Sequence, residues 1–389
     1  MAGSFDIVIV GGGVMGCSTA YHLTKDGRAG RVAVVERDPT YEYASTPRSA
    51  GGIRQQFSLP ENIRMSQYGL GFYKRFGELM AVDGEAPEVG LKQQGYLFLA
   101  TEGGAETLRA CHRTQSGLGA PVLLLDRAGL AARYPSMALD DIALGSLGTE
   151  DGWMDPFAIL QGFRRKARAQ GATFVADTVV GVERDGNRAT GVRLKAGGRL
   201  AAGAVVNAAG PWAGEVARMV GMDLPIEPVR RMVHYFEVRE RLEPFPLVID
   251  PSGLYFRPEG AGYISGKSNP DEPAGANFEV DHDYFMDVIW PGLAARVPAF
   301  EALKPGRSWA GLYDVNRLDE NLIIGPWAGA LDNFHVICGF SGHGLQQAPA
   351  AGRALAELLL DGAFRTIDLT RMTYARVAEG RPLPEVGIV

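Results

Sequence analysis

The N-terminal segment holds the pattern that most restricts the fold. Phe5–Val10 (FDIVIV) is an apolar, β-branched run that leads into three glycines, and Arg31–Glu36 (RVAVVE) is a second run of the same kind. Runs without polar alternation are typical of parallel strands that are buried on both faces. The stretch between them, from Val14 to Leu23, has helical character. The order strand, helix, strand predicts a β-α-β unit at the start of the chain.

The turn between the first strand and the helix has the spacing of a dinucleotide-binding fingerprint. Gly11, Gly13 and Gly16 form the pattern G-x-G-x-x-G. The first glycine allows a tight turn, the second lets a phosphate approach the backbone, and the third lets helix and strand pack closely. The helix N-terminus offers free N–H groups to a pyrophosphate. Glu36 ends the second strand, where a carboxylate accepts the ribose hydroxyls and disfavours a 2′-phosphate, so NADP is not expected.

Composition and charge argue against several other classes of protein. The chain has 389 residues and a net charge of -6, without the basic patch that nucleic-acid binding needs. Cys17, Cys111 and Cys338 form no CxxC pair, which fits a reducing compartment. No run reaches the ~18 apolar residues that cross a bilayer. We therefore expect a cytoplasmic protein with no transmembrane segment, no metal site and no nucleic-acid partner.

Later runs indicate that the nucleotide-binding domain is discontinuous. Ala204–Ala208 (AVVNA) and Phe334–Cys338 (FHVIC) look like further buried strands, and a helix is expected from about Pro349 to Leu360. Between them, runs such as Gly95–Ala100 and Met232–Val238 mix aromatic and polar residues, which is typical of antiparallel strands with one solvated face. The segment after Leu383 carries no such signal and is expected to be loose.

These patterns predict two domains. The first is an α/β Rossmann-type domain with a mostly parallel sheet, made of residues 1–90, 150–220 and 310–389. The second is an inserted, mostly antiparallel α+β domain, made of residues 91–149 and 221–309, which is expected to bind the substrate.

Four further segments follow the glycine fingerprint along the chain. They are Ser45–Arg54 (STPRSAGGIR), Asn207–Trp212 (NAAGPW), Asn321–Pro326 (NLIIGP) and Gly339–Gly344 (GFSGHG). Together with the fingerprint they resemble the D-amino-acid oxidase superfamily, in particular its sarcosine oxidase, dimethylglycine dehydrogenase and glycine oxidase branch. The resemblance spans Asp6 to about Leu360 and implies that the dinucleotide is FAD. Because there is no second glycine fingerprint for a nicotinamide nucleotide, we expect the electrons to come from the substrate.

The resemblance also implies how the residues are placed around FAD. Ala208 passes near the cofactor, backbone around Val179 meets the adenine, and the Gly342–Gly344 loop covers the flavin edge at N1 and the C2 carbonyl. The expected FAD contacts are Gly11, Gly13, Val14, Met15, Gly16, Glu36, Arg37, Ser45, Thr46, Gly51, Gly52, Val179, Ala208, Gly210, Trp212, Gly311, Gly342, His343, Gly344, Leu345 and Gln346. Relatives with covalent flavin carry a cysteine at the position of Gly311 or a histidine at that of Ser49, so we expect non-covalent FAD.

Four residues are expected at the substrate. Arg54 matches the family arginine that grips a substrate carboxylate, and a guanidinium does so with two parallel hydrogen bonds. Tyr255 matches an active-site tyrosine, with a buried core tyrosine as the alternative. His343 is expected to touch the substrate or to pack over the flavin. Gln346 replaces a lysine of the sarcosine oxidases, which makes sarcosine itself doubtful as the substrate.

The resemblance implies an amine oxidase or dehydrogenase. The expected substrate is a carboxylate-bearing amine, either a secondary or N-alkylated amino acid or a D-amino acid. Its Cα passes a hydride to flavin N5, and the resulting imine hydrolyses. The expected electron acceptor is oxygen, a quinone or an electron-transfer protein. Relatives that react quickly with oxygen place a lysine before this glycine, whereas Lys267 follows Gly266, so the resemblance favours a quinone or an electron-transfer protein over oxygen. Two alternatives stay open: a non-catalytic flavoprotein that acts in complex assembly, and a 2-hydroxy-acid dehydrogenase of the same superfamily.

Overall fold

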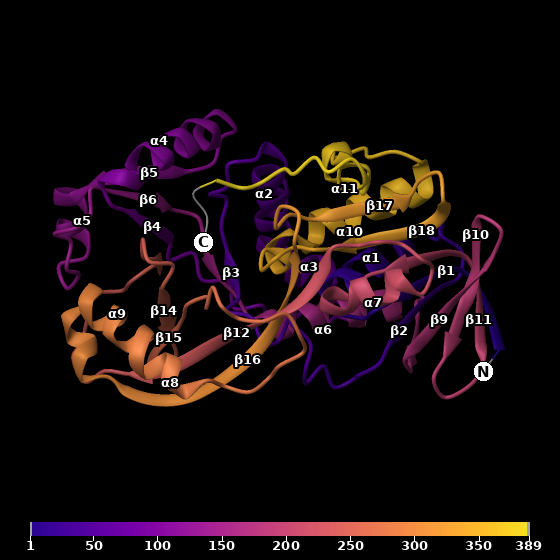
Figure 1. Cartoon of the computed structure of the whole chain (residues 1–389), viewed down its shortest axis with the longest axis horizontal. Helices are drawn as coiled ribbons and strands as arrows, with labels where there is room; N and C mark the ends of the chain where they lie inside the picture. The colour runs from indigo at the N-terminus through magenta and orange to yellow at the C-terminus, as the bar shows by residue number, and fades with distance from the viewer. Residues whose placement is uncertain (1, 387–389) are drawn as a thin grey trace.

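Two β-sheets of eight strands each organise the chain, and both draw strands from segments that lie far apart in the sequence. The computed structural model describes residues 2–386. In Figure 1 the first sheet lies on the right, near the N-terminus, and the second lies on the left. A third, two-stranded sheet is formed by β3 (Gly52–Ile53) and β7 (Gly152–Trp153), which pair antiparallel.

The first sheet is mostly parallel, which confirms the predicted Rossmann-type architecture. Its order is β17-β18-β11-β1-β2-β8, and all neighbours from β18 to β8 run parallel. β17 pairs antiparallel with β18, and β10 and β9 extend β11 as an antiparallel hairpin. The strands are β1 (Ala2–Val10), β2 (Val32–Glu36), β8 (Thr173–Ala176), β9 (Val179–Asp185), β10 (Arg188–Leu194), β11 (Arg199–Asn207), β17 (Ile323–Trp327) and β18 (Leu331–Cys338).

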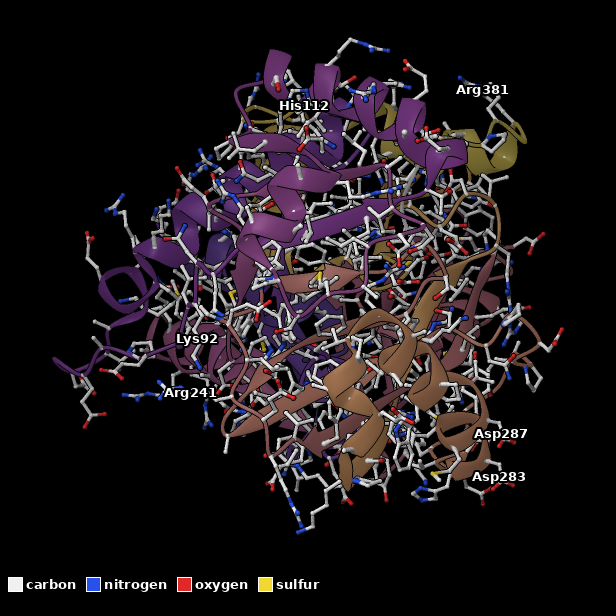
Figure 2. All side chains as sticks on the ribbon, turned by 90° about the vertical axis from the view of Figure 1, so that its left-hand side faces the viewer. Lys92, His112, Arg241, Asp283, Asp287 and Arg381 are labelled. Carbon is white, nitrogen blue, oxygen red and sulfur yellow. The ribbon has the colours of Figure 1, made fainter. Side chains whose placement is uncertain are left out.

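The second sheet is mostly antiparallel, and only β13 and β4 pair in parallel. Its order is β16-β12-β15-β14-β13-β4-β6-β5. The strands are β4 (Tyr96–Ala100), β5 (Val122–Asp126), β6 (Leu144–Gly148), β12 (Ile226–Glu237), β13 (Leu247–Ile249), β14 (Tyr255–Glu259), β15 (Gly262–Gly266) and β16 (Lys304–Asn316). Figure 2 views this end of the molecule, and acidic and basic side chains such as Asp283, Asp287 and Arg241 share its outer edge.

The two longest strands lead from one sheet to the other. β12 and β16 pair from Ile226 opposite Asn316 to Glu237 opposite Lys304. β12 follows helix α7 (Ala213–Arg218), which packs on the first sheet. After β16 the chain returns to the first sheet as β17. The domain limits remain a prediction, and the limit at residues 309 and 310 falls inside β16.

Helices pack against both faces of the first sheet and against both faces of the second. They are α1 (Val14–Thr24), α2 (Pro60–Lys74), α3 (Phe76–Met80), α4 (Glu102–Gly117), α5 (Arg127–Arg133), α6 (Pro156–Ala169), α7 (Ala213–Arg218), α8 (His282–Tyr284), α9 (Trp290–Arg296), α10 (Gly344–Asp361) and α11 (Ala375–Ala378). Within residues 2–386, no helix is both long enough and apolar enough to cross a membrane.

Successive residues of β1 from Ile7 to Val10 pack alternately into two different buried clusters, one on each face of the sheet. Ile7 and Ile9 lie in one buried cluster with residues of α1, α6 and α10. Val8 and Val10 lie in a second cluster with residues of α7 and of the β9-β10 hairpin. Each residue from Ile7 to Val10 therefore has apolar neighbours, which is why this part of the strand shows no polar alternation.

Helix α10 begins earlier than the sequence predicts. Its first residue is Gly344, and Pro349 lies inside the helix. Proline has no N–H to donate to the carbonyl oxygen four residues earlier. That oxygen, on Leu345, instead accepts the hydroxyl of Tyr73 from α2 at 2.6 Å. The predicted start at Pro349 was wrong because the compensating donor comes from another helix.

The chain is held in place as far as Val386, so the expectation of a loose segment after Leu383 is wrong for the described residues. The Glu385 carboxylate accepts the backbone N–H of Ser58 at 2.7 Å, at the N-terminus of α2. A carboxylate is stabilised there by the positive end of the helix dipole. Residues 387–389 lie outside the described part of the chain.

Substitution of Tyr73 tests the compensation for Pro349. Tyr73→Phe leaves the buried Leu345 carbonyl without its donor, so we expect the free energy of unfolding to fall by about 1–3 kcal/mol. In a Pro349→Ala background, residue 349 regains an N–H for the same oxygen, and Tyr73→Phe should cost less. Denaturant unfolding of the four proteins measures both costs. Equal costs in the two backgrounds would contradict the proposed compensation.

Candidate active site

A cleft with about 1370 Å³ of open space, partly continuous with solvent, lies at the carboxyl ends of β1, β2 and β11. Ligands of doubly wound sheets bind at this edge. The cleft is also lined by residues 312–314 near the end of β16 and by Phe340, Gly342, Gly344 and Leu345 before and within α10. Most of the predicted FAD contacts lie on its surface: Gly11, Gly13, Val14, Met15, Glu36, Arg37, Ser45, Thr46, Val179, Ala208, Gly210, Trp212, Gly342, Gly344 and Leu345.

The three glycines of the fingerprint have different surroundings. Gly11 has a φ of 100°, and a Cβ built on it would lie 2.5 Å from the carbonyl oxygen of Ala208. A Cβ on Gly16 would overlap the carbonyl oxygen of Gly11. A Cβ on Gly13 would meet no atom within 4 Å, because this residue faces the open cleft. Gly11 and Gly16 thus permit the packing of α1 on the sheet, and Gly13 leaves room for a ligand.

Glu36 ties the end of β2 to the glycine turn. Its Oε2 accepts the N–H of Gly12 at 2.7 Å, and its Oε1 accepts the N–H of Asp38 at 2.8 Å. Burial raises the pKa of Glu36, and these two N–H donors oppose the rise. Each carboxylate oxygen keeps a second lone pair, which suits it to accept ribose hydroxyls.

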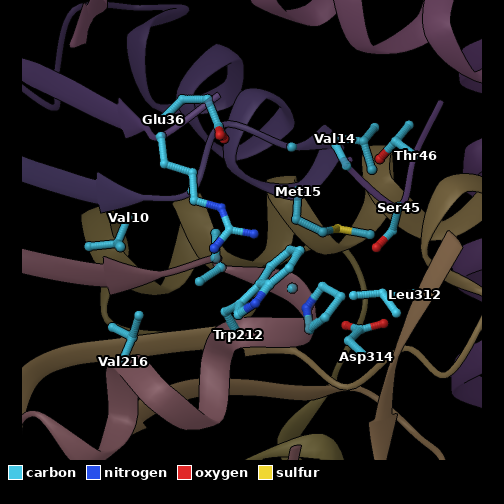
Figure 3. A pocket seen from close by; sticks show the side chains of 18 of the residues that line it. Val10, Val14, Met15, Glu36, Ser45, Thr46, Trp212, Val216, Leu312 and Asp314 are labelled. Atoms are coloured by element: carbon cyan, nitrogen blue, oxygen red, sulfur yellow. The ribbon is translucent and has the colours of Figure 1, made fainter. Parts of the chain in front are cut away.

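Arg37 and Trp212 face each other across the cleft. The Arg37 guanidinium lies 3.5 Å from the centre of the Trp212 ring. Figure 3 shows the Trp212 ring in this part of the cleft, below Glu36 and to the right of Val216. A cation over an indole face is attractive, so the pair joins the β2 wall to the segment that follows β11.

The unpaired groups of the cleft fit the pyrophosphate and ribityl parts of FAD. The N-terminus of α1 has no side-chain cap, so its first N–H groups are available to a pyrophosphate. The buried hydroxyl of Ser45 has no partner within residues 2–386, and Figure 3 places it beside Thr46 and Met15. FAD would be held by these groups together with Gly13 and Glu36.

At the other end of the cleft, Asp314 holds the loop that precedes α10. Its Oδ2 accepts the N–H of Gly339 at 2.8 Å and the N–H of Phe340 at 3.2 Å. Burial raises the pKa of Asp314 to about 6, against the effect of these N–H donors. Figure 3 places the carboxylate beside Leu312 in the cleft. Sequence reasoning missed Asp314, although it stands three residues after Gly311, a position that was singled out.

Arg54 does not line the cleft, and its guanidinium is surrounded mostly by aromatic side chains. The residue is 4% exposed, and its guanidinium lies 4.5 Å from the Phe57 ring centre, 5.0 Å from Phe98 and 5.5 Å from Tyr96. Its Nη2 is 3.0 Å from Nε2 of His343. Within residues 2–386 it forms no ion pair with a carboxylate. The guanidinium is therefore a buried cation without an anionic partner in contact.

His343 and Gln346 fix Arg54 from the start of α10. Gln346 Oε1 accepts the backbone N–H of Arg54 at 2.6 Å. The His343 ring meets the Phe57 ring edge-on, with centres 5.1 Å apart. Burial and the nearby Arg54 charge lower the pKa of His343 to about 3. The imidazole is therefore neutral at physiological pH and accepts a hydrogen bond from the guanidinium.

Three neighbouring tyrosines, Tyr96, Tyr255 and Tyr313, extend from the surroundings of Arg54 to the lining of the cleft. Tyr255 stands at the start of β14, and burial raises its pKa, with the neighbouring Tyr313 and Tyr96 adding to the rise. Tyr313 lines the cleft. Sequence reasoning found Tyr255 but missed Tyr96, Phe98 and Tyr313. The alternation of Tyr96 and Phe98 along β4, which puts both on one face of the strand, is a signal that was available.

Some predicted FAD contacts do not line the cleft. Gly51 and Gly52 shape the segment before Arg54, and a Cβ on Gly51 would overlap the carbonyl oxygen of Met154. A Cβ on Gly311 would lie 3.0 Å from the Cβ of Arg48. Gly16, His343 and Gln346 also lie behind the surface of the cleft.

A family model described as FAD dependent oxidoreductase (DAO) matches residues 6–358. The chain belongs to this family. The match confirms the predicted superfamily and FAD as its cofactor.

This DAO chain is similar to several named proteins along its whole length. It is 42% identical to FAD-dependent oxidoreductase domain-containing protein 1 of Xenopus laevis, over 99% of this chain and 85% of the relative. The stretches SAGGIRQQF and GFSGHGLQQ predict this similarity. It is 30% identical to the mitochondrial sarcosine dehydrogenase of Mus musculus, over 92% of this chain but 40% of that protein.

Among solved structures, the L-proline dehydrogenase of P. horikoshii matches with a TM-score of 0.88 and 27% identity, over 98% of this chain and 100% of the other. The glycine oxidase of Geobacillus kaustophilus matches with a TM-score of 0.82 and 23% identity, over 95% and 98% of the two chains. The second similarity concerns the fold alone.

Two glycine substitutions separate ligand binding from packing. Gly13→Ala should leave the fold unchanged but weaken FAD binding about tenfold or more, because the methyl group would occupy the space for the phosphate. Gly16→Ala should lower the melting temperature as well, because its Cβ overlaps the Gly11 carbonyl. FAD titration and thermal unfolding measure the two effects. A normal FAD affinity of Gly13→Ala would place the pyrophosphate elsewhere.

Acid precipitation tests the mode of flavin attachment. Since Gly311 and Ser49 stand where covalent relatives carry attaching residues, all of the flavin should appear in the supernatant after treatment with trichloroacetic acid. The yellow colour of the pellet and the absorbance of the supernatant report the outcome. Flavin that stays with the precipitated chain would show that another residue attaches it.

Proposed function

We propose that the protein oxidises a carboxylate-bearing amine with FAD as the electron acceptor. The observation that supports this most is the state of Arg54, a guanidinium that is 4% exposed and has no carboxylate in contact within the described residues. A buried charge is costly unless an opposite charge and hydrogen bonds compensate it. A substrate carboxylate supplies both.

The surroundings of Arg54 suit it to hold such a carboxylate in one orientation. Gln346 fixes its backbone, and neutral His343 accepts from one Nη2 hydrogen, which leaves further donors of the fork for an anion. The rings of Phe57 and Phe98 exclude water from the guanidinium. Electrostatic attraction is stronger in such a low-dielectric site than in water.

In the proposed reaction Arg54 binds the substrate and the cleft binds FAD. FAD, when bound, accepts the hydride that leaves the substrate Cα. Arg54 positions the substrate, and the hydroxyls of Tyr255 and Tyr313 can donate to its carboxylate or limit its size. The N-terminus of α10 at Gly344 has no side-chain cap, so its N–H groups can stabilise negative charge at the edge of the ring.

The substrate class remains that predicted from the sequence, a secondary or N-alkylated amino acid or a D-amino acid. Support comes from the names of two similar proteins, a sarcosine dehydrogenase and an L-proline dehydrogenase. We also propose oxygen, a quinone or an electron-transfer protein as the acceptor, and the cytoplasm as the location, although the sarcosine dehydrogenase relative is mitochondrial.

Anaerobic bleaching of the flavin tests the proposal. We expect at least one amine from a panel of N-methyl, cyclic and D-amino acids to bleach the bound FAD. Bleaching only by 2-hydroxy acids would assign the protein to the hydroxy-acid dehydrogenases. Absence of bleaching by the whole panel, at high protein and substrate concentrations, would favour a non-catalytic flavoprotein that acts in complex assembly.

Arg54 variants test how the carboxylate is held. Arg54→Ala should raise KM about 100-fold or more at unchanged FAD content, since one partner of a desolvated ion pair is lost. Arg54→Lys keeps the charge but loses the planar fork, so its KM should lie between the two. Steady-state kinetics with the amine found in the bleaching panel gives the values. An unchanged KM of Arg54→Ala would remove Arg54 from the substrate site.

A further inference from the structure

A second ionisable group lies behind Arg54. Asp151 is fully buried, at 0% exposure, in the short connection between β6 and β7. β7 pairs with β3, whose last residue, Ile53, directly precedes Arg54. The pairing of these two short strands therefore brings a buried acid and the buried arginine together, although they lie far apart in the sequence.

Asp151 binds the residue that follows Arg54. Its Oδ2 accepts the backbone N–H of Gln55 at 3.0 Å, and its Oδ1 accepts the side-chain amide of Gln55 at 3.0 Å. Gln346 holds the backbone N–H of Arg54 itself. The backbone on both sides of the Arg54 side chain is thus fixed by buried hydrogen bonds.

Few charges face Asp151. Burial raises its pKa to about 6, while the bonds from Gln55 and the positive charge of Arg54 oppose the rise. Glu150 adds to the rise, but it is exposed and paired with Lys74. The other ionisable neighbour is Tyr96, whose pKa burial raises, so it carries no charge at physiological pH. Arg54 is therefore the charge to which Asp151 responds most.

An unpaired acceptor lies next to the Asp151 carboxyl group. The side-chain amide of Gln56 donates to the backbone and hydroxyl oxygens of Ser146, and its buried Oε1 has no donor within residues 2–386. A Cβ built on Gly148 would touch Asp151 Oδ2 and would lie 3.0 Å from Gln56 Oε1. The two oxygens therefore face the same small space, and a protonated Asp151 has an acceptor at hand.

We propose that Asp151 is a positioning residue of the anion site, which fixes Arg54 through Gln55 and takes up one proton when a carboxylate binds to Arg54. This inference rests on the proposed function of Arg54. In the free site the Asp151 carboxylate offsets part of the guanidinium charge without contacting it. A bound carboxylate would leave two anions beside one cation, and a proton taken from solvent onto Asp151 restores the balance.

The coupling between proton uptake and carboxylate binding predicts how the affinity changes with pH. Because the bound state holds one more proton than the free state, binding weakens as pH rises. The dissociation constant should increase by up to about tenfold per pH unit above the pKa of Asp151 in the free protein, which is about 6. The increase ends at the higher pKa that Asp151 has in the complex.

The experiment measures carboxylate binding to the FAD-loaded protein from about pH 6 to about pH 9. Anthranilate and acetate serve as probes, and the change in flavin absorbance, or calorimetry, gives the dissociation constant. We expect a rising constant for the wild type and a nearly constant, lower value for Asp151→Asn. The amide of the asparagine can also donate to Gln56 Oε1. The matched control is Glu150→Gln in the same connection, which should keep the slope of the wild type.

A measurement on the unaltered protein makes the test independent of how the variants fold. Binding of anthranilate at about pH 7 in weakly buffered solution should take up close to one proton per site, seen with a pH indicator. Binding that is lost in Arg54→Ala but takes up no proton would overturn the role of Asp151 and leave the proposed function standing. Equal slopes for the wild type and Asp151→Asn would do the same. Failure of both probes to bind would count against the carboxylate site itself.

Discussion

The close contact of α1 with the first sheet determines where the rest of the site can form. Gly16 lies so near the carbonyl oxygen of Gly11 that no side chain fits, and Gly11 lies equally near Ala208 at the end of β11. These contacts bring the uncapped N-terminus of α1 to the edge where β1, β2 and β11 end. Glu36 then ties β2 to the same turn. The place of the cleft is therefore determined by the backbone contacts of Gly11 and Gly16 and by the Glu36 side chain.

The surroundings of Arg54 come from the small sheet, from the second sheet and from helix α10. Arg54 follows β3, its aromatic neighbours Tyr96 and Phe98 come from β4, and His343 comes from the start of α10. None of these elements is close to another in the sequence. The position of Arg54 therefore depends on how these elements pack together. Gln346 and Asp151 hold the backbone on both sides of its side chain.

The sequence was sufficient for features that depend on local spacing. The glycine fingerprint, Glu36 and the buried runs around Ile9 and Val206 could be predicted because each needs only a turn or a strand of neighbouring residues. The roles of Asp151 and Asp314 could not be predicted, because their hydrogen-bond partners, Gln55 and the Gly339–Phe340 turn, lie far from them in the sequence. The start of α10 was mispredicted for the same reason: Tyr73, which compensates for Pro349, belongs to a different helix.

The order of the strands also has a consequence for biosynthesis. β1 pairs with β11, which in turn pairs with β18, so the central strands of the first sheet are separated by most of the chain. Contacts of such long range make folding slow, and the apolar strands made first stay exposed until their partners have been synthesised. Glu385 reaches the N-terminus of α2 only at the end of this process. The first sheet can therefore close around β11 only after β18 has been synthesised.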